Sequence, residues 1–247
     1  MKTRGITWQV LGVAVLTLWL AAPGISRADI KHRFSFTNDA SDSVGGANGT
    51  LMGSATVSGG QVVLNDATQD YVDLPIGDTI GNLTNATFET WFTWDHYLGQ
   101  FWSRIFDFGT GTAMNMFLPP RNGASNNTPR FALTTAGGGQ EQIAQIIGVL
   151  PNTVTVGTPT EIYIAVTIDA DNQIATVYLN GKPAAIIFNF TNTPSLMGST
   201  SQNYLGKSQY NDPYFNGSIN EFRIYDRALS AAEIAASFAA GPDATPP

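Results

Sequence analysis

The clearest structural pattern in the chain lies at residues 160–181, which read TEIYIAVTIDADNQIATVYLNG. Large apolar residues stand at every second position of Ile162–Ile168, and this period of two predicts a strand with one buried face. The polar run Asp169–Asn172 predicts a turn, and Ile174–Leu179 predicts the returning strand. The pair Asn180-Gly181 follows, and it favours a second tight turn because both central positions of a type I′ turn need positive φ.

On both sides of this hairpin, short β-like runs alternate with turns rich in Gly, Asn, Asp and Thr. Such spacing is typical of a β-sandwich or a barrel. The further predicted strands begin at Phe34, Val62, Tyr71, Thr87, Arg104, Arg130 and Ile219. The sequence therefore predicts an all-β domain, and Trp91, inside the aromatic run that begins at Thr87, is expected in its core.

One helix is predicted, close to the C-terminus. Ser230-Ala231-Ala232-Glu233 has the pattern of a capping box, in which the first and fourth residues satisfy each other's backbone N–H groups. Ile234 and Phe238 follow at helical spacing, and Gly241-Pro242 ends the helix. We expect Ile234 and Phe238 to cover one open end of the core.

The first residues have the pattern of an export signal. Lys2 and Arg4 precede the apolar stretch Val10–Leu20, which is too short for a membrane span of roughly 20 residues. Ser26-Arg27-Ala28 fits a signal-peptidase site. The predicted organisation is a signal peptide at 1–28, a single domain at 29–241 and a linker-like tail at 242–247.

Charge and cysteine content exclude several classes of function. The chain has 12 basic and 19 acidic residues, a formal net charge of −7, which disfavours binding to nucleic acid or anionic membranes. The absence of cysteine excludes disulfides, thiolate metal sites and cysteine nucleophiles, and in an exported protein it favours a bacterial source. Neutral glycans, protein partners and Ca²⁺ remain compatible with this composition.

Several segments resemble laminin-G-like jelly-roll domains of the concanavalin A-like lectin/glucanase superfamily. They are Phe88–Trp91, Val177–Gly181, Tyr204–Lys207, Phe215–Tyr225 and Arg227–Ile234, and the resemblance spans roughly residues 31–240. It implies a two-sheet antiparallel jelly-roll β-sandwich whose N- and C-terminal strands are neighbours. Members of this superfamily bind glycans or proteins, and some are glycosidases or lyases, so the fold alone does not choose a function.

The sequence lacks the catalytic patterns of this superfamily. Retaining glucanases carry Glu-x-Asp-x-(x)-Glu on one strand, whereas the glutamates of this chain are isolated. The fragment Tyr204–Tyr210 is similar to a lyase segment, but it has no Gln-x-His partner strand, and the only histidines are His32 and His96. We therefore predict a protein that is not an enzyme, with a polysaccharide hydrolase or lyase as the weaker alternative.

Two groups of side chains are candidates for sugar binding, because each places aromatic faces beside hydrogen-bonding groups. The first flanks one loop and contains Trp94, His96, Tyr97, Trp102 and Arg104. The second lies at the expected rim of the sandwich and contains Tyr210, Asp212 and Tyr214. The alternative for the aromatic members is an ordinary structural role.

The oxygen-rich loop Asp39–Gly49 is a candidate calcium site, because Ca²⁺ takes six to eight oxygen ligands. The resemblance implies that Asp42, Gly46 and Asn48 would bind a structural Ca²⁺ together with Asn220 or Glu221 of the last strand. The alternative is a solvated turn with Asx-type hydrogen bonds.

These observations favour an exported recognition module at the cell surface or in the medium, binding carbohydrate and stabilised by Ca²⁺. The alternative is a structural or adhesive protein that binds protein partners or assembles with itself.

Overall fold

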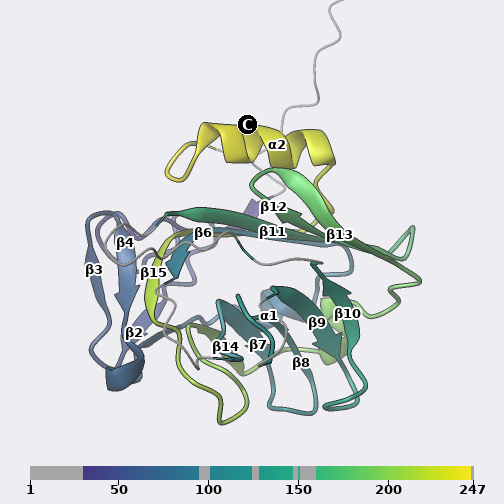
Figure 1. Ribbon diagram of the computed structural model, residues 1–247, viewed down its shortest axis with the longest axis horizontal. Coiled ribbons are helices and arrows are strands. Elements are labelled where there is room, and N and C mark those ends of the chain that lie inside the picture. Colours follow the sequence, from purple (N-terminus) through teal and green to yellow (C-terminus); the bar gives the residue numbers. More distant parts are fainter. Residues whose placement is uncertain (1–29, 95–100, 124–127, 147–149, 151–159, 246–247) are drawn as a thin grey trace, which may run out of the picture.

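The computed structural model describes residues 30–94, 101–123, 128–146, 150 and 160–245, so the predicted leader at 1–28 lies outside the described residues. The described residues form two antiparallel sheets that face each other, and a helix lies across the outside of one sheet (Figure 1). This arrangement confirms the predicted β-sandwich with a short C-terminal helix. Within the described part of the chain, no helix has the length and apolar character that crossing a membrane requires.

The first sheet has eight strands in the order β13-β12-β11-β6-β15-β4-β3, with β1 pairing to the second half of β15. Their bounds are β1 (Ile30–Phe34), β3 (Thr56–Ser58), β4 (Gln61–Leu64), β6 (Ala86–Trp94), β11 (Ile162–Asp169), β12 (Ile174–Leu179), β13 (Lys182–Phe188) and β15 (Gly217–Tyr225). The pairing of β1 with β15 makes the first and last strands neighbours, as the resemblance implied.

The second sheet has seven strands in the order β10-β9-β8-β7-β14-β5-β2. Their bounds are β2 (Thr50–Met52), β5 (Tyr71–Asp73), β7 (Phe106–Gly109), β8 (Asn115–Leu118), β9 (Arg130–Thr134), β10 (Gln142–Gln145) and β14 (Gln202–Leu205). Single helical turns occur at α1 (Gly77–Ile80), η1 (Asp66–Thr68) and η2 (Pro194–Met197).

The hairpin predicted at residues 160–181 is present. β11 pairs with β12 from Ile164↔Leu179 onward, and the turn into β13 uses Asn180 and Gly181 at φ values of 47° and 76°. The prediction of one buried face was too narrow, because the side chains of β11 are buried on both faces. One face meets the opposite sheet, and the other is covered by a helix.

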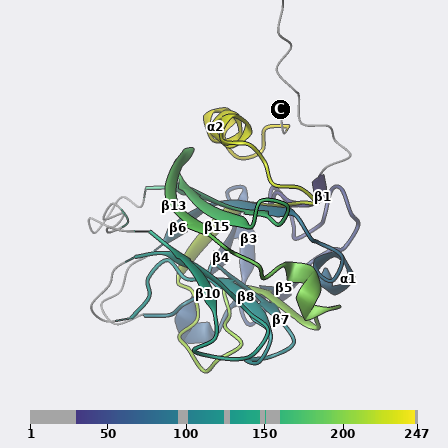
Figure 2. The ribbon, with the colours of Figure 1, turned by 90° about the vertical axis from the view of Figure 1, so that its right-hand side faces the viewer.

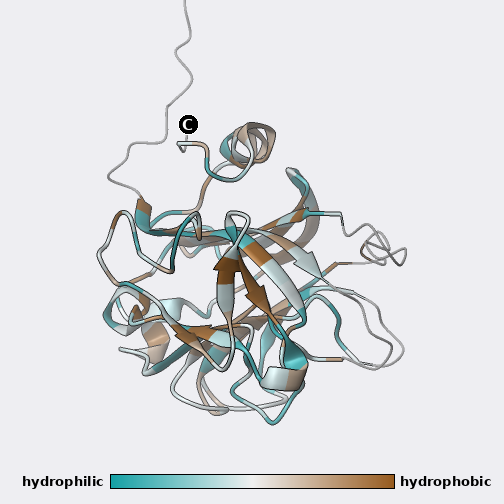
Figure 3. Cartoon of the chain, turned by 90° about the vertical axis from the view of Figure 1, so that its left-hand side faces the viewer, coloured by the Kyte–Doolittle hydropathy of each residue, from teal (hydrophilic) through white to brown (hydrophobic). Residues whose placement is uncertain are grey.

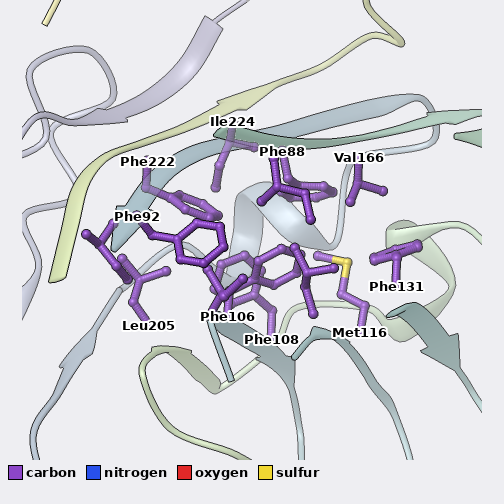
Figure 4. Close-up of a cluster of buried hydrophobic side chains, with 14 of the residues drawn as sticks. Phe88, Phe92, Phe106, Phe108, Met116, Phe131, Val166, Leu205, Phe222 and Ile224 are labelled. Atoms are coloured by element: carbon purple, nitrogen blue, oxygen red, sulfur yellow. The ribbon is translucent and has the colours of Figure 1, made fainter. Parts of the chain in front are cut away.

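The main core lies between the two sheets, where aromatic residues from both sheets meet (Figure 4). Phe88 and Phe92 of β6 face Phe106 and Phe108 of β7, and the hydrophobic residues concentrate on the strands (Figure 3). Because successive side chains of a strand point to opposite faces, Asp107 of β7 points away from this core. Its environment on the outer face is described below.

The helix α2 (Ala231–Ala240) lies on the outer face of the eight-stranded sheet (Figures 1 and 2). The predicted capping box is confirmed, with the Ser230 hydroxyl accepting from the Glu233 N–H and the Glu233 carboxylate accepting from the Ser230 N–H. Ile234 is buried in a second apolar cluster with Ile30, Trp91, Tyr163, Ala165, Tyr178, Tyr225 and Leu229. The helix therefore covers a sheet face and not an open end of the core, and Phe238 stays 41% exposed. Trp91 is buried, as expected, but in this second cluster.

A buried polar network fixes the sheet beneath α2. The carboxylate of Glu89 accepts hydrogen bonds from the hydroxyls of Tyr163 (2.7 Å), Tyr225 (2.6 Å) and Ser237 (3.0 Å). It also pairs with the Arg223 guanidinium at 3.0 Å. A carboxylate buried this deeply is tolerated because four donors satisfy its oxygens, one of them a cation.

The start of the predicted linker-like tail is anchored to the same network. The Asp243 N–H donates to Glu221 across 2.7 Å, and Arg223 donates to the Ala244 carbonyl across 2.9 Å. Residues that follow α2 thus contribute to the packing of the outer face.

Candidate functional site

A cavity of about 510 Å³ opens on the outer face of the seven-stranded sheet. We call it the Trp102 cavity, and it is lined by Trp102, Arg104, Phe117, Arg130, Gly138, Gly139, Glu141, Ile143, Tyr210 and Asp212. Phe117, Arg130 and Ile143 alternate with core residues of β8, β9 and β10, so their side chains form its floor. The connection from β14 to β15, which supplies Tyr210 and Asp212, lies on the side of the sandwich away from α2 (Figure 1).

This cavity joins the two predicted sugar-binding groups. Trp102 and Arg104 come from the first group, and Tyr210 and Asp212 come from the second, about 100 residues later in the chain. Four of the eight predicted residues therefore line one cavity. The Tyr210 hydroxyl donates to the Thr112 carbonyl across 3.1 Å, which fixes the second group against the β7–β8 turn.

Trp102 is held in an unusual backbone conformation at the edge of the cavity. Its φ is 68°, in the left-handed region that bulky residues avoid, and such a conformation costs about 1–3 kcal/mol. Its N–H donates to the Arg121 carbonyl across 3.0 Å, and its carbonyl accepts from Arg104. Backbone strain of this kind clusters at ligand sites, where the surrounding structure imposes one orientation on a side chain.

Arg104 positions the segments that carry Trp102 and Asp212, and its charge is already paired. Only 2% of its side chain is exposed, and its guanidinium donates to the Trp102 carbonyl, to Asp107 (3.3 Å) and to Asp212 (2.9 Å). It also lies 4.3 Å from the centre of the Phe117 ring. The expectation of a ligand-binding arginine is thus refined, because Arg104 fixes Trp102 and Asp212 relative to each other.

Asp107 supports the site from below. Its carboxylate accepts from the Gln209 N–H (3.0 Å) and from Asn115 (3.1 Å), in addition to Arg104. Burial raises the pKa of Asp107 to about 6, against the opposing effect of the Arg104 charge. Asp107 was not among the predicted site residues, although a single acid between Phe106 and Phe108 marks an outward-facing position.

Arg130 and Glu141 also line the cavity and were not among the predicted site residues. The Arg130 guanidinium lies 4.8 Å from the Trp102 ring centre, and its Nε is buried without a hydrogen-bond partner in the described structure. Burial lowers the pKa of Arg130, while the nearby Glu141 raises it. A buried N–H donor without a partner gains free energy from any ligand oxygen that accepts its hydrogen bond.

Two of the other predicted sugar-binding residues, Trp94 and Tyr214, are described and do not line this cavity. Trp94 is only 5% exposed and belongs to the main core, so its predicted binding role is wrong because no face of the ring reaches solvent. His96 and Tyr97 lie outside the described residues. Tyr214 lines a neighbouring cavity, which is described below.

The predicted calcium ligand Asp42 is already saturated with hydrogen-bond donors. One oxygen accepts the N–H groups of Arg33, Val44 and Gly45, and the other accepts the Ala47 N–H and faces His32 Nδ1 at 2.6 Å. Burial alone would raise the pKa of Asp42, but His32 and these N–H groups hold it well below its ordinary value. The opposite ring nitrogen of His32 lies 2.7 Å from the Thr79 hydroxyl, which links β1 to α1.

Each of the other predicted side-chain ligands makes a polar contact of its own. The Asn48 side chain accepts from the Asp42 N–H, Glu221 pairs with Arg33 and Arg223, and Asn220 donates to Glu161. Gly46 sits in the same turn, with a φ of 72°. Among the described residues, no group of three or more acidic or histidine side chains is arranged to hold a metal. The arrangement does not fit a Ca²⁺ ion and matches the alternative of Asx-type hydrogen bonds.

Comparison with known proteins gives one family match. Residues 65–235 match the family profile described as concanavalin A-like lectin/glucanases superfamily. No curated protein matches this sequence.

Among solved structures, the chain is similar to domain 4 of AbnA, an extracellular arabinanase of Geobacillus stearothermophilus, in complex with arabinotriose. The TM-score is 0.66 at 22% identity, over 84% of this chain and 97% of that one. A sialidase CBM40 of Ruminococcus gnavus bound to α2,6 sialyllactose matches with a TM-score of 0.51 at 17% identity, over 64% of this chain and 85% of that one. The binding domain of botulinum neurotoxin serotype D/C matches with a TM-score of 0.67 at 13% identity, over 86% of this chain and 52% of that one. At these identities the likeness shows a shared fold.

Proposed function

This chain belongs to the concanavalin A-like lectin/glucanase superfamily, and we propose that it is a non-catalytic carbohydrate-binding module whose ligand occupies the Trp102 cavity. Export fits this role, since the glycans that such modules bind lie outside the cell. The predicted leader supports export, and N-terminal sequencing of secreted protein should find Asp29 as the first residue.

The observation that carries the proposal is the chemistry gathered in the Trp102 cavity. Ligand sites combine apolar and aromatic surface with a few convergent polar groups in a cavity of roughly 300–1,000 Å³. Here Trp102 and Tyr210 supply aromatic surface, Arg130 supplies a donor, and Asp212 and Glu141 supply acceptors. Sugars present apolar C–H faces and rings of hydroxyls, and this set of side chains matches both.

The similar solved structures support the same class of ligand. Their descriptions name arabinotriose and sialyllactose as bound glycans. A further similar structure is of botulinum neurotoxin type C, whose cell entry is described as dependent on interaction with two ganglioside molecules. The sequence lacks the paired carboxylates of the superfamily's glucanases, which supports binding without hydrolysis.

A glycan array probed with the protein tests this proposal, provided that it includes arabinotriose, sialyllactose and ganglioside headgroups. We expect binding that Trp102→Asn abolishes while the melting temperature is kept, because asparagine tolerates positive φ. The matched control is Phe188→Asn, which removes an aromatic ring that is 66% exposed on the opposite sheet. An empty array, or equal binding by Trp102→Asn, would contradict the proposal. Release of reducing ends or of unsaturated sugars would indicate an enzyme instead.

A second candidate function is self-assembly through β13, an edge strand of the eight-stranded sheet. Ile186 and Phe188 are 53% and 66% exposed on its outward face, and an apolar edge strand is a template for pairing with another chain. Sedimentation without glycan distinguishes this candidate, because Phe188→Lys would then convert oligomers to monomers. A monomer at all concentrations would exclude it.

A further inference from the structure

A second cavity adjoins the first on the outer face of the seven-stranded sheet. We call it the Tyr214 cavity; its volume is about 420 Å³, and it is lined by Gln202, Tyr204, Lys207, Ser208, Gln209, Tyr210, Asn211, Asp212 and Tyr214. Tyr210 and Asp212 line both cavities. The two cavities therefore lie on either side of one short loop segment.

The chemistry of the Tyr214 cavity repeats that of the first. The Lys207 ammonium lies 4.3 Å from the Tyr71 ring centre and 4.5 Å from that of Tyr204. The Tyr71 ring in turn packs against Tyr204 (5.3 Å between centres) and Tyr214 (6.1 Å). The negative face of an aromatic ring attracts a cation, so these contacts hold the Lys207 ammonium in place. Each cavity thus combines aromatic rings with a positioned cation.

The order of strands places the two cavities side by side across the sheet. The Trp102 cavity lies over β8, β9 and β10, and the Tyr214 cavity lies over β14, with β7 between them. The segment 208–212 separates them above β7, because Asp107 of that strand accepts the Gln209 N–H. Ser208 donates to Asp212 across 2.9 Å and stiffens this segment.

We propose that the two cavities are adjacent subsites for one linear oligosaccharide, which crosses the segment 208–212 and contacts Asp212 from both. This inference rests on the proposed function and deepens it, because it makes the ligand a glycan chain rather than a terminal sugar. Asp212 suits the shared position, since Arg104 and Ser208 fix its carboxylate while 23% of its side chain stays exposed. Ligand surface buried in both subsites at once should raise affinity with chain length until both are filled.

Titration calorimetry with ladders of α-1,5-arabino-, β-1,4-xylo- and β-1,4-gluco-oligosaccharides, each from monomer to octamer, tests the inference. For the ladder that binds, we expect Kd to fall by about tenfold or more, equivalent to about 1.4 kcal/mol of binding free energy, over an intermediate range of lengths and then to level off. Tyr214→Ala and Lys207→Gln should each remove this gain while leaving the affinity for short oligomers unchanged. Trp102→Asn should weaken every length, and Phe188→Asn should change none.

The outcomes separate this inference from the proposed function. If short and long oligomers bind equally, or if Tyr214→Ala and Lys207→Gln leave the length dependence intact, the second subsite is refuted and the Trp102 cavity stands. If no ladder binds and the array is also empty, both proposals are overturned. Melting curves of each variant confirm that the fold is retained, and a variant that melts early is replaced by Tyr214→Ser or Lys207→Met.

Discussion

Arg104 and Asp212 form an ion pair at 2.9 Å, although 108 residues separate them in the sequence. Arg104 is buried and also pairs with Asp107 beneath it, so one guanidinium connects the sheet to the loop that borders both cavities. The geometry of the candidate site therefore depends on a cation that a ligand hardly reaches.

Arg104→Met should destabilise the fold and weaken glycan binding together. The change leaves the carboxylate of Asp107 buried without its cation, and breaking a buried pair on one side costs about 3–5 kcal/mol. Urea unfolding measures this loss. It should appear with an unchanged dependence of the free energy on urea concentration, since the surface exposed on unfolding is the same.

A double variant provides the control for this prediction. Arg104→Met combined with Asp107→Asn removes both charges, while the asparagine carbonyl still accepts from the Gln209 N–H. We expect it to recover part of the stability but not the binding, because Asp212 remains without its partner. A double variant that unfolds at the sum of the single losses would show that the two residues act independently.

Helix α2 offers a matched pair of apolar substitutions. Ile234→Ala should lower the free energy of unfolding by about 2–5 kcal/mol, because Ile234 is fully buried against the outer sheet face. Phe238→Ala should lower it by less. The Phe238 ring centre lies 5.7 Å from that of Tyr163, but the residue stays 41% exposed. Thermal unfolding of both variants makes the comparison. Equal losses of stability in the two variants would contradict the packing of α2 on the sheet through Ile234.

The hairpin of β11 and β12 could be predicted because its pattern is local. Alternation in Ile162–Ile168 and the turn pair Asn180-Gly181 need no distant partner. The same period of two, applied to Phe88, Phe92 and Trp94, places Trp94 on the inward face, so its burial could have been predicted as well. That Glu89 lies between sheet and helix could not, because the helix that covers it comes more than 130 residues later.

The candidate site was predicted only in part for a similar reason. Aromatic and polar loop residues marked Trp102, Arg104, Tyr210 and Asp212, but the sequence does not show that strand order brings them together. Asp107 and Arg130 lie on strands, where single charges beside apolar residues indicate an outward face without indicating a cavity. The calcium ligands rested on the resemblance, and the sequence could not show that backbone N–H groups fill the oxygens of Asp42.

Acid should weaken the attachment of α2 through Glu233. The hydrogen bonds from Arg227 and Ser230 lower the pKa of Glu233 from 4.5 to about 2. Because the lowered pKa belongs to the folded state, this stabilisation is present above the ordinary pKa and is lost as the pH falls from about 5 towards 2. Partial solvent exposure keeps the contribution at about 1 kcal/mol, as for other helix caps.

Glu233→Gln tests this prediction, since glutamine keeps the capping hydrogen bond to Ser230 but does not titrate. The variant should be less stable than the parent at pH 7, and the difference should shrink towards pH 2 in urea unfolding. If the difference in stability between parent and variant grew as the pH fell, the lowered pKa of Glu233 in the folded state would be contradicted. Glu161→Gln is the matched control, because it makes the same exchange at an exposed position outside α2, where the glutamine carbonyl can still accept from Asn220.

The hydrogen bonds around Asp42 predict that calcium does not stabilise this protein through the Asp42 loop. Since five donors already surround its carboxylate, EDTA and added Ca²⁺ should leave the melting temperature unchanged. Asp42→Asn should lower the stability by about 2–3 kcal/mol in either condition, because one oxygen that accepts hydrogen bonds is replaced by an amide that donates them. If EDTA instead lowered the melting temperature of the parent protein but not of Asp42→Asn, Asp42 would be a calcium ligand and the loop would have to rearrange to expose its oxygens. Isothermal titration with Ca²⁺ is an independent test. We expect no heat of binding, because the Asp42 oxygens that would bind the ion already accept hydrogen bonds.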